Sequence, residues 1–319
     1  MTNKMDRIQR MVVTQHRLIA AILFTGLTMF VSTPGVEAAF FDSAGKSARA
    51  MGMGEVFLAS SDDALGYWYN PAGLANLESR QIGLGYGKPA AAISSLMSSQ
   101  LNVAMPLGEG SGLGLGFAYG GISEATDMVV SGAYGLSLGG LDVGANVKVM
   151  YWSMTGQDNE YGPGTDEDLS KVSFSLDASA QYSLGSMMGL DEVGAGVYVR
   201  DAIMPNISES GDDGGQLPIE AGVGLMVRQN DITIGGDVGF VDGSTVLRAG
   251  AETPIGGSNL RVRSGFVFES DFEDELERAD LGLGLGYSFG SLMFDYAYNV
   301  PFAMKETNGK HFVSFGFSF

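Results

Sequence analysis

The feature that most constrains this chain is a strict alternation of small and large apolar residues. Residues 281–289 read LGLGLGYSF, so leucine, tyrosine and phenylalanine take the odd positions, and glycine or serine takes the even ones. Successive side chains of a β-strand point to opposite faces. One face of this strand is therefore strongly apolar, while the other has almost no side-chain bulk. We expect the apolar face to contact lipid and the glycine face to line the inside of a barrel.

Segments of this kind recur from about residue 80 to the C-terminus, and we count fourteen of them. Their centres lie near Leu84, Val103, Leu115, Tyr134, Val147, Leu176, Val197, Val223, Ile234, Ala249, Val262, Leu283, Tyr296 and Phe315. A length of about ten residues suits a tilted strand that crosses a bilayer. Only a closed barrel pairs every backbone group of such strands in hydrocarbon. The sequence predicts an all-β fold, a transmembrane antiparallel β-barrel of about fourteen strands.

The connections between these segments differ in length in a regular way. Tight turns such as 139–140 and 289–291 follow even-numbered segments, whereas several long acidic stretches follow odd-numbered ones, at 153–170, 201–216 and 270–280. Short periplasmic turns and longer outer loops are typical of outer-membrane barrels. The last segment, 311–319, alternates aromatic residues and ends on Phe319, which resembles the terminal-strand signal of such proteins. We predict the outer membrane of a Gram-negative-type bacterium.

The N-terminus has the pattern of an export signal. Four basic residues precede an uncharged run over 18–31, and a small-residue cleavage site ends at Ala38. The run is shorter than the roughly 20 residues that a permanent transmembrane helix needs. The chain contains no cysteine, which leaves no disulfide and no lipoprotein anchor, and its net charge of −19 makes nucleic acid a poor partner. Residues 1–38 are predicted to be a signal peptide.

Residues 39–79 do not follow the alternation. Pro71 removes a backbone donor and keeps Asn70 out of helical geometry, so this region is not a central strand. A stretch of this length before a glycine-lined barrel (residues 80–319) is a candidate plug, or hatch, for the lumen. The alternative is a mobile periplasmic tail, but Phe57, Tyr67 and Trp68 would be costly to leave in water.

The region "SARAMGMGEVFLASSDDALGYWYNPAGLANL" resembles the N-terminal signature of the PorV/PorQ family, which belongs to a superfamily with the FadL fatty acid transporters. The matching elements are 48–54, the pair Asp62-Asp63 and the motif 70–74, and the likeness continues through most of the barrel. The resemblance implies a fourteen-stranded barrel with an N-terminal hatch. In FadL-like members the hatch gates a path for hydrophobic molecules. The hatch and ligand-path residues implied here are Trp68, Asn70, Pro71, Ala72 and Gly73.

PorV itself is an accessory of the type IX secretion system and receives exported proteins at the outer membrane. The present chain departs from that pattern in two ways, since Glu55 stands where a small residue is usual and its surface loops are short for handling protein cargo. Two functions are therefore open. The first is binding or transport of hydrophobic or amphipathic small molecules, and the alternative is a role as an accessory for protein secretion or another outer-membrane protein interaction.

Charged residues fall on several faces that the alternation assigns to the lumen. They are Lys148, Asp177, Arg200, Glu220, Arg228, Asp237, Arg248, Glu252, Arg261, Arg263 and Asp295. One interpretation is an ionic path, or an anchor for the head group of an amphipathic ligand. The other is a set of paired charges that holds the hatch to the wall, because buried charges need partners.

The sequence does not predict an enzyme. His311 is the one histidine that follows the predicted signal peptide, and there is no cysteine, so thiol catalysis and zinc sites built on several histidines are excluded. The acidic stretches 158–170, 208–215 and 271–280 lack the spacing of an EF-hand loop, and solvated loops are favoured over divalent-cation sites. No cofactor and no metal is predicted. The expected partners are outer-membrane lipid and either a hydrophobic ligand or a secretion-system or cargo protein.

Overall fold

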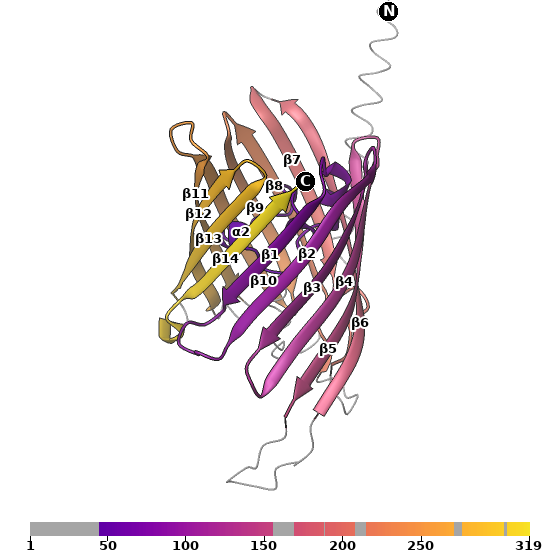
Figure 1. Cartoon of the computed structure of the whole chain (residues 1–319), viewed down its shortest axis with the longest axis vertical. Helices are drawn as coiled ribbons and strands as arrows, with labels where there is room; N and C mark the ends of the chain where they lie inside the picture. Colours follow the sequence, from indigo (N-terminus) through magenta and orange to yellow (C-terminus); the bar gives the residue numbers. More distant parts are fainter. Residues whose placement is uncertain (1–44, 156–168, 188, 208–214, 271–275, 303–304) are drawn as a thin grey trace, which may run out of the picture. The chain divides into compact units, whose positions relative to one another are not determined.

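The computed structural model describes residues 45–155, 169–187, 189–207, 215–270, 276–302 and 305–319, and these form a single closed barrel (Figure 1). The predicted signal peptide 1–38, residues 39–44 of the predicted plug and most of the acidic loops lie outside this part of the chain. The fourteen strands are β1 (Gln81–Lys88), β2 (Met97–Gly108), β3 (Ser111–Gly121), β4 (Ala125–Leu138), β5 (Leu141–Met154), β6 (Leu169–Met187), β7 (Leu190–Arg200), β8 (Glu220–Gln229), β9 (Ile232–Val241), β10 (Ser244–Pro254), β11 (Leu260–Ser270), β12 (Leu276–Phe289), β13 (Leu292–Pro301) and β14 (Lys310–Ser318). The predicted fold class is confirmed, and every predicted centre falls within its strand.

Each strand pairs in antiparallel fashion with its neighbours in the chain, and β1 pairs with β14 to close the ring. The closing register runs from Gln81 opposite Ser318 to Lys88 opposite His311. Connections at one end are short, such as 139–140 between β4 and β5 and 290–291 between β12 and β13. We call this the short-turn end. The opposite end, the long-loop end, has longer connections at 89–96, 201–219 and 302–309, together with tight ones at 122–124 and 242–243.

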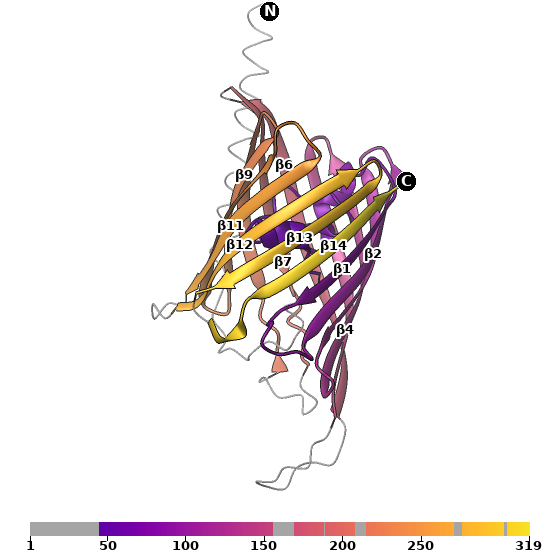
Figure 2. The ribbon, with the colours of Figure 1, turned by 60° about the vertical axis from the view of Figure 1, so that its left-hand side comes forward.

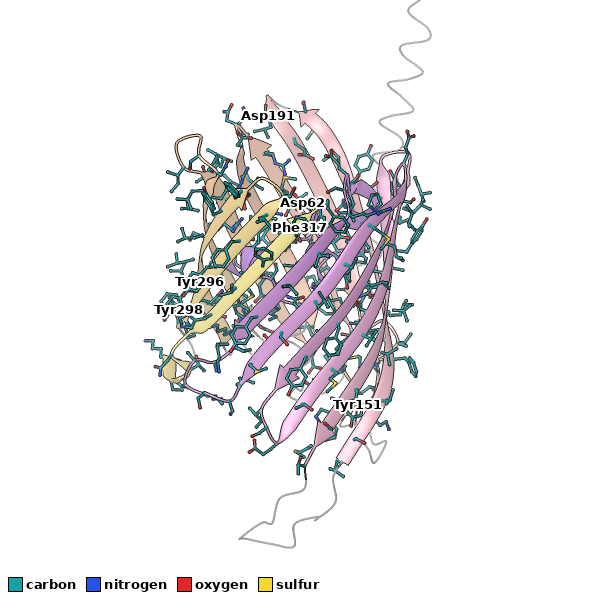
Figure 3. All side chains as sticks on the ribbon, viewed as in Figure 1. Asp62, Tyr151, Asp191, Tyr296, Tyr298 and Phe317 are labelled. Carbon is teal, nitrogen blue, oxygen red and sulfur yellow. The ribbon has the colours of Figure 1, made fainter. Side chains whose placement is uncertain are left out.

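The alternation separates lipid-facing from lumen-facing side chains as predicted. Leu283, Leu285 and Tyr287 of β12 point outward and are 45–50% exposed in the isolated chain. Figure 3 shows the dense layer of side chains that surrounds the outside of the ring. Gly282 and Gly284 face inward on the same strand and are buried. Within the described parts of the chain, no helix is long and apolar enough to cross a membrane.

Residues 45–79, here called the inner segment, lie inside the ring of strands (Figure 2). The segment consists of short helical turns, α2 (Ala48–Gly52), η3 (Gly66–Trp68) and η4 (Pro71–Asn76). The Ser47 hydroxyl accepts the amide of Ala50 at 3.2 Å and begins α2. The side chain of Asn70 begins η4 in the same way, and Pro71 takes the first helical position, where its missing N–H costs nothing. The remaining short helix, η6 (Lys305–Thr307), precedes β14 at the long-loop end.

The wall glycines allow the backbone of the inner segment to approach the strands closely. The α-carbons of Gly52 and Gly284 are so near that a Cβ on Gly52 would meet the Gly284 α-carbon at 2.9 Å. A Cβ on Gly250 or Gly265 would overlap the backbone of Met53. The glycine face of these strands therefore provides the space that the inner segment occupies.

Candidate functional site

Within the described part of the chain, we consider two cavities inside the barrel, and the inner segment lies between them. The larger one has a volume of about 390 Å³, and its lining includes Asp201, Pro218 and Lys310 near the long-loop end. The smaller one is about 300 Å³ and is lined by Asp231 and Met293 beside the short turns. Residues of the inner segment border both spaces, with Glu55 in the larger and Arg49 in the smaller.

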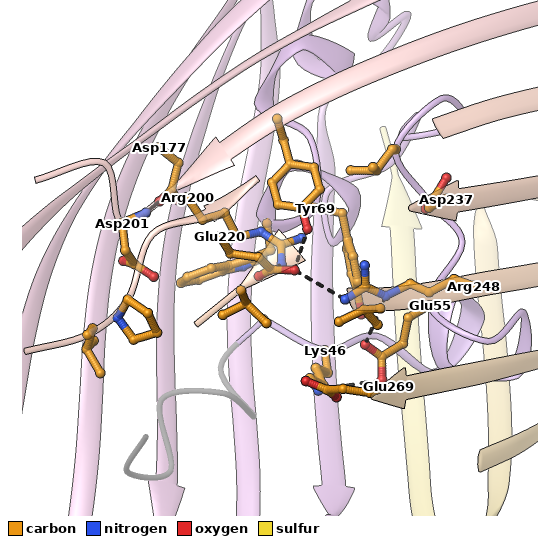
Figure 4. Close-up of a pocket in the computed structure, with 18 of the residues that line it drawn as sticks. Lys46, Glu55, Tyr69, Asp177, Arg200, Asp201, Glu220, Asp237, Arg248 and Glu269 are labelled. Atoms are coloured by element: carbon orange, nitrogen blue, oxygen red, sulfur yellow. Dashed lines mark hydrogen bonds and ion pairs between the residues drawn. The ribbon is translucent and has the colours of Figure 1, made fainter. Parts of the chain in front are cut away.

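The larger cavity has an apolar part and a charged part. Leu58, Trp68, Val129, Met150 and Leu217 provide the apolar lining. Many charged residues of the lining form ion pairs, and part of this charged lining is drawn in Figure 4. The charged lining comprises Lys46, Glu55, Lys148, Asp177, Arg200, Asp201, Glu220, Asp237, Arg248, Glu269, Arg278 and Lys310. A space of this kind suits an amphipathic molecule better than a purely apolar one, because a bare hydrocarbon would displace water from the charged lining without offering it a hydrogen bond.

Glu55 joins the inner segment to the wall of the larger cavity. Its carboxylate lies 2.5 Å from Arg278 on β12, 3.5 Å from Lys46 and 4.0 Å from Arg248 on β10. Burial by itself raises the pKa of the Glu55 carboxyl, but attraction to Arg278, Lys46 and Arg248 outweighs it and holds the pKa well below its ordinary value. Glu55 also has a positive backbone φ of 63°, a conformation that residues other than glycine seldom adopt. We call these four residues the Glu55 clasp.

Arg49 makes the corresponding connection at the smaller cavity. Its guanidinium lies 2.5 Å from Asp62 and 3.0 Å from Asp63 within the inner segment, and 3.6 Å from Glu252 on β10. It also lies over the ring of Phe57, 5.0 Å from the ring centroid. Because burial disfavours the charged form, the pKa of the Asp63 carboxyl is raised. Glu252 receives two further arginines from β11, Arg261 and Arg263, so one carboxylate links the segment to two neighbouring strands.

Aromatic side chains hold the segment to the opposite wall. Tyr67 and Trp68 stack at 5.5 Å, and both donate to the Asn102 amide oxygen on β2, at 3.1 and 2.7 Å. The Tyr67 hydroxyl also pairs with Ser131 on β4 at 2.8 Å. Their rings pack with Leu74 in an apolar cluster against β2–β5. The segment is thus anchored by a large apolar cluster against β2–β5 and by ion pairs to β10–β12. A smaller apolar cluster joins Ala48 and Met51 of α2 to Ala297 on β13 and Phe312 on β14.

The five sequence-predicted hatch residues lie together in the inner segment, but they do not all border a cavity. Trp68 lines the larger one. Asn70 is fully buried, and Pro71 and Ala72 pack against wall glycines of β4 and β5. Gly73 is pressed against Ser61, where a Cβ would overlap the Ser61 backbone. Asn70 to Gly73 therefore hold the segment in shape and in position, while Trp68 is open to the space beside it.

Replacing Asn70 with alanine is expected to loosen this turn. The Asn70 amide oxygen accepts the backbone N–H of Ala72 at 3.0 Å, and its amide nitrogen donates to the carbonyl of Leu58. The Ala variant removes the Asn70 donor from the Leu58 carbonyl and leaves the Ala72 N–H with the Ser179 hydroxyl at 3.0 Å as its acceptor. Loss of the buried partner costs about 1–3 kcal/mol of stability. Thermal unfolding of Asn70→Ala in detergent tests this, with Asn76→Ala as a control near the edge of the same turn. Equal midpoints for Asn70→Ala and the wild type would contradict it.

The predicted lumen charges separate into two groups. Lys148, Asp177, Arg200, Glu220, Asp237 and Arg248 line the larger cavity, whereas Arg228, Glu252, Arg261 and Arg263 line the smaller, where Asp295 pairs with Arg263 at 2.5 Å. Their partners are mostly other members of this set, such as Lys148 with Asp177 at 2.8 Å and Arg200 with Glu220 at 2.8 Å.

Sequence reasoning missed several residues of the site. Lys46 and Arg49 belong to a segment without periodicity, so the sequence did not indicate which way their side chains point. Arg278 and Lys310 continue the inward positions of β12 and β14 beyond the clearest part of the alternation, and extending the period by one or two residues would have found them. Glu55 had one signal, its departure from the small residue that the resembled family has there.

Among the residues that the structure describes, no group of three or more histidine or carboxylate side chains is arranged to hold a metal ion. The acidic stretches that were considered for divalent cations fall mainly outside these residues, at 156–168, 208–214 and 271–275.

The sequence matches no family model and no curated protein, so the resemblance to the PorV/PorQ family stays a prediction. Among solved structures, the toluene transporter TbuX of Ralstonia pickettii superposes with a TM-score of 0.66 at 12% identity, over 86% of this chain and 98% of that one. The toluene transporter TodX of Pseudomonas putida gives a TM-score of 0.62 at 11% identity, over 86% and 98%. A FadL homologue of Pseudomonas aeruginosa gives 0.56 at 11% identity, over 86% and 95%.

These likenesses extend over nearly the whole length of each neighbour, and at such low identity they establish the fold. The class is a closed, fourteen-stranded antiparallel β-barrel with the fold of these outer-membrane proteins.

Proposed function

We propose that this barrel binds hydrophobic or amphipathic small molecules and passes them across the outer membrane, with the inner segment as its hatch. The observation that carries the proposal is the placement of the segment between two cavities, one toward each end of the barrel. A molecule that enters either cavity meets the segment. Passage therefore requires that the segment, or part of it, moves.

The contacts of the segment suit such a movement. On the side of β10–β12 it is held by two sets of ion pairs, the Glu55 clasp and the contacts of Arg49. A charged ligand or water can take the place of one partner in an ion pair, so that the buried charge stays compensated while the segment moves. The large cluster around Tyr67 and Leu74 is the part that stays attached to the wall. The part that is released is α2, whose apolar contacts are fewer: Ala50 touches that cluster, and Ala48 and Met51 pack in a smaller one.

The nature of the ligand follows from the lining and is supported by the neighbours. Trp68, Val129 and Met150 offer an apolar surface beside Arg200 and Lys148. The neighbours TbuX and TodX are described as toluene transporters. The charged half of this cavity favours amphipathic ligands, whose polar group replaces water among the ion pairs while the apolar part covers Met150 and Val129.

The test uses a variant that fills the larger cavity without touching its charges. Val129→Trp places a large ring in the cavity, whereas Val130→Trp places the same ring on the lipid-facing side of the same strand, where Val130 is 55% exposed. We expect the uptake of radiolabelled decanoate, an amphipathic probe, into proteoliposomes to fall about tenfold or more in the first variant and to stay unchanged in the second. Equal uptake in both variants would contradict the proposal, provided that both migrate as folded barrels on unheated gels.

A role in protein secretion is the second prediction from the sequence, and the same preparation distinguishes it. Protein extracted from native membranes in mild detergent is analysed by mass spectrometry for lipids and for co-purifying proteins. A stoichiometric lipophile that is lost when residues 45–79 are deleted supports the transport proposal. A reproducible protein partner with no enriched lipophile supports the secretion accessory instead.

A further inference from the structure

The lipid-facing surface of this barrel carries very few charges. Nearly all the basic side chains of the strands point inward, where they form the ion pairs described above. Among the strand residues whose side chains the structure describes, two basic groups lie on outward positions, Lys88 at the end of β1 and His311 at the start of β14. A charge on the lipid face costs about 2–4 kcal/mol at the middle of the bilayer and about 0–1 kcal/mol near the interface. Lys88 and His311 lie at the ends of their strands, where the cost of a lipid-facing charge is lowest.

These two residues are direct neighbours. Lys88 stands opposite His311 in the register of β1 and β14, and directly opposed residues of antiparallel strands point to the same side of the sheet. Both follow the outward parity of Tyr86 and Val313. Since this is also the pair of strands that closes the barrel, the two basic groups mark one particular position on its circumference.

Two tyrosines of β13 fix the histidine in place. The Tyr296 hydroxyl lies 2.9 Å from Nδ1 of His311, and the Tyr298 ring packs on the imidazole with centroids 4.7 Å apart. When the Tyr296 hydroxyl donates to Nδ1, the ring proton of a neutral imidazole is on Nε2. His311 then offers an N–H donor at Nε2. Figure 3 shows Tyr296 and Tyr298 on the outside of β13, toward the end near η6.

Lys88 has donors to spare. Its ammonium donates to the carbonyl of Ser94, which uses one of its three N–H groups. Within the described part of the chain it forms no ion pair, whereas the inward lysines Lys148 and Lys310 are each paired with carboxylates. A lysine kept beside a histidine donor, at the level of the tyrosines that mark a membrane interface, complements an anion that is itself fixed at that level.

We propose that Lys88 and His311, supported by Tyr296 and Tyr298, bind the phosphate group of a membrane lipid at the long-loop edge of the lipid-facing surface. The ammonium contributes the charge and the imidazole a directed hydrogen bond, while the lipid chains lie along the outward apolar residues of β1, β13 and β14. The site is separate from the lumen, and it does not depend on the transport proposal.

The test is native mass spectrometry of the full-length barrel in detergent, titrated with phosphatidylglycerol. Diacylglycerol with the same acyl chains serves as the lipid without phosphate. We expect phosphatidylglycerol adducts to be selective for the wild type, with affinity about fivefold lower in Lys88→Gln and lower still in the double variant Lys88→Gln/His311→Gln. Lys305→Gln is the matched control, since Lys305 is an exposed lysine at the same end of the barrel that lies off the strands.

Two results would overturn the assignment. One is equal binding of phosphatidylglycerol by the wild type and the double variant. The other is equal binding of diacylglycerol and phosphatidylglycerol by the wild type, which would show that the acyl chains alone account for the adducts. A loss in Lys305→Gln as large as that in Lys88→Gln would also contradict it, because general attraction to surface lysines would then suffice.

Discussion

Leucine in place of Gly250 is expected to displace the inner segment from its position against β10 and so to open the lumen. A Cβ at position 250 would overlap the backbone carbonyl oxygen of Met53. A Cβ is fixed by the backbone, and the carbonyl is part of it, so neither group can rotate away as the end of a flexible side chain could. Overpacking of a well-packed interior costs about 1–3 kcal/mol, and a conflict between two backbones lies at or above the upper part of that range. We expect a much larger single-channel conductance in planar bilayers and an inner segment open to protease, while the strands stay closed as a barrel.

The matched control is Gly132→Leu. Gly132 lies on an outward position of β4, where the nearest atom to an added Cβ would be a methyl carbon of Leu115 at 3.9 Å. This variant adds the same bulk to a strand glycine without touching the inner segment. An unchanged conductance in Gly250→Leu, or an equal rise in both variants, would show that the wall glycines do not position the segment.

Glutamine in place of Glu55 is expected to release the same segment by removing charge instead of adding bulk. Arg278, Lys46 and Arg248 would then share a buried site without the carboxylate that they surround. Removal of one partner from a buried ion pair costs about 3–5 kcal/mol. We expect a smaller cost here, because Arg278 keeps its pair with Asp280 at 2.6 Å and Arg248 keeps its pair with Glu220 at 3.2 Å. Conductance and thermal unfolding measure the release, and we expect the variant to open at pH 7.

The pH dependence of the wild type provides an independent measurement of the same clasp. The folded-state pKa of Glu55 lies below its unfolded value, so the stability that it contributes is complete above about pH 4.3, the ordinary pKa of a glutamate. That stability is lost as the pH falls through the lower folded-state pKa. The wild type should therefore open only in strong acid. Arg228→Gln is the control, because its pair with Glu192 is more than a third exposed on the arginine side and contributes about 0–1 kcal/mol. A Glu55→Gln variant as closed and as stable as Arg228→Gln would contradict the role of the clasp.

The strands could be predicted because one local rule governs them. In a lipid-facing strand each residue belongs to one of two faces, so the period of two in 281–289 determines both the element and its orientation. The same rule placed Glu252 and Arg263 in the lumen before their contacts were known. It could not pair Glu252 with Arg49, because that contact depends on the position of a segment that has no period.

The inner segment shows this limit most clearly. The glycines at 282 and 284 indicated an empty inner face, yet the sequence gives no direct indication that Gly52 and Met51 fill it. Asn70 and Pro71 attract notice as a motif, but their burial behind the cavity wall is a consequence of the completed barrel. Trp68 is the member of that motif region whose side chain reaches open space, which depends on how η3 and η4 pack together.

The contacts of the inner segment also bear on the order in which the molecule assembles. The amide of Ala48 donates to the hydroxyl of Ser314 at 2.8 Å, and these residues are 266 positions apart in the chain. Part of the binding site for the first segment of the barrel is therefore absent until the last strand has been placed. Contacts of such sequence separation form late, since the entropy of a very large loop must be overcome first. The filling of the lumen and the pairing of β1 with β14 thus belong to one final step of assembly. In a chain arrested before that step, the binding site of the inner segment on the strands is incomplete.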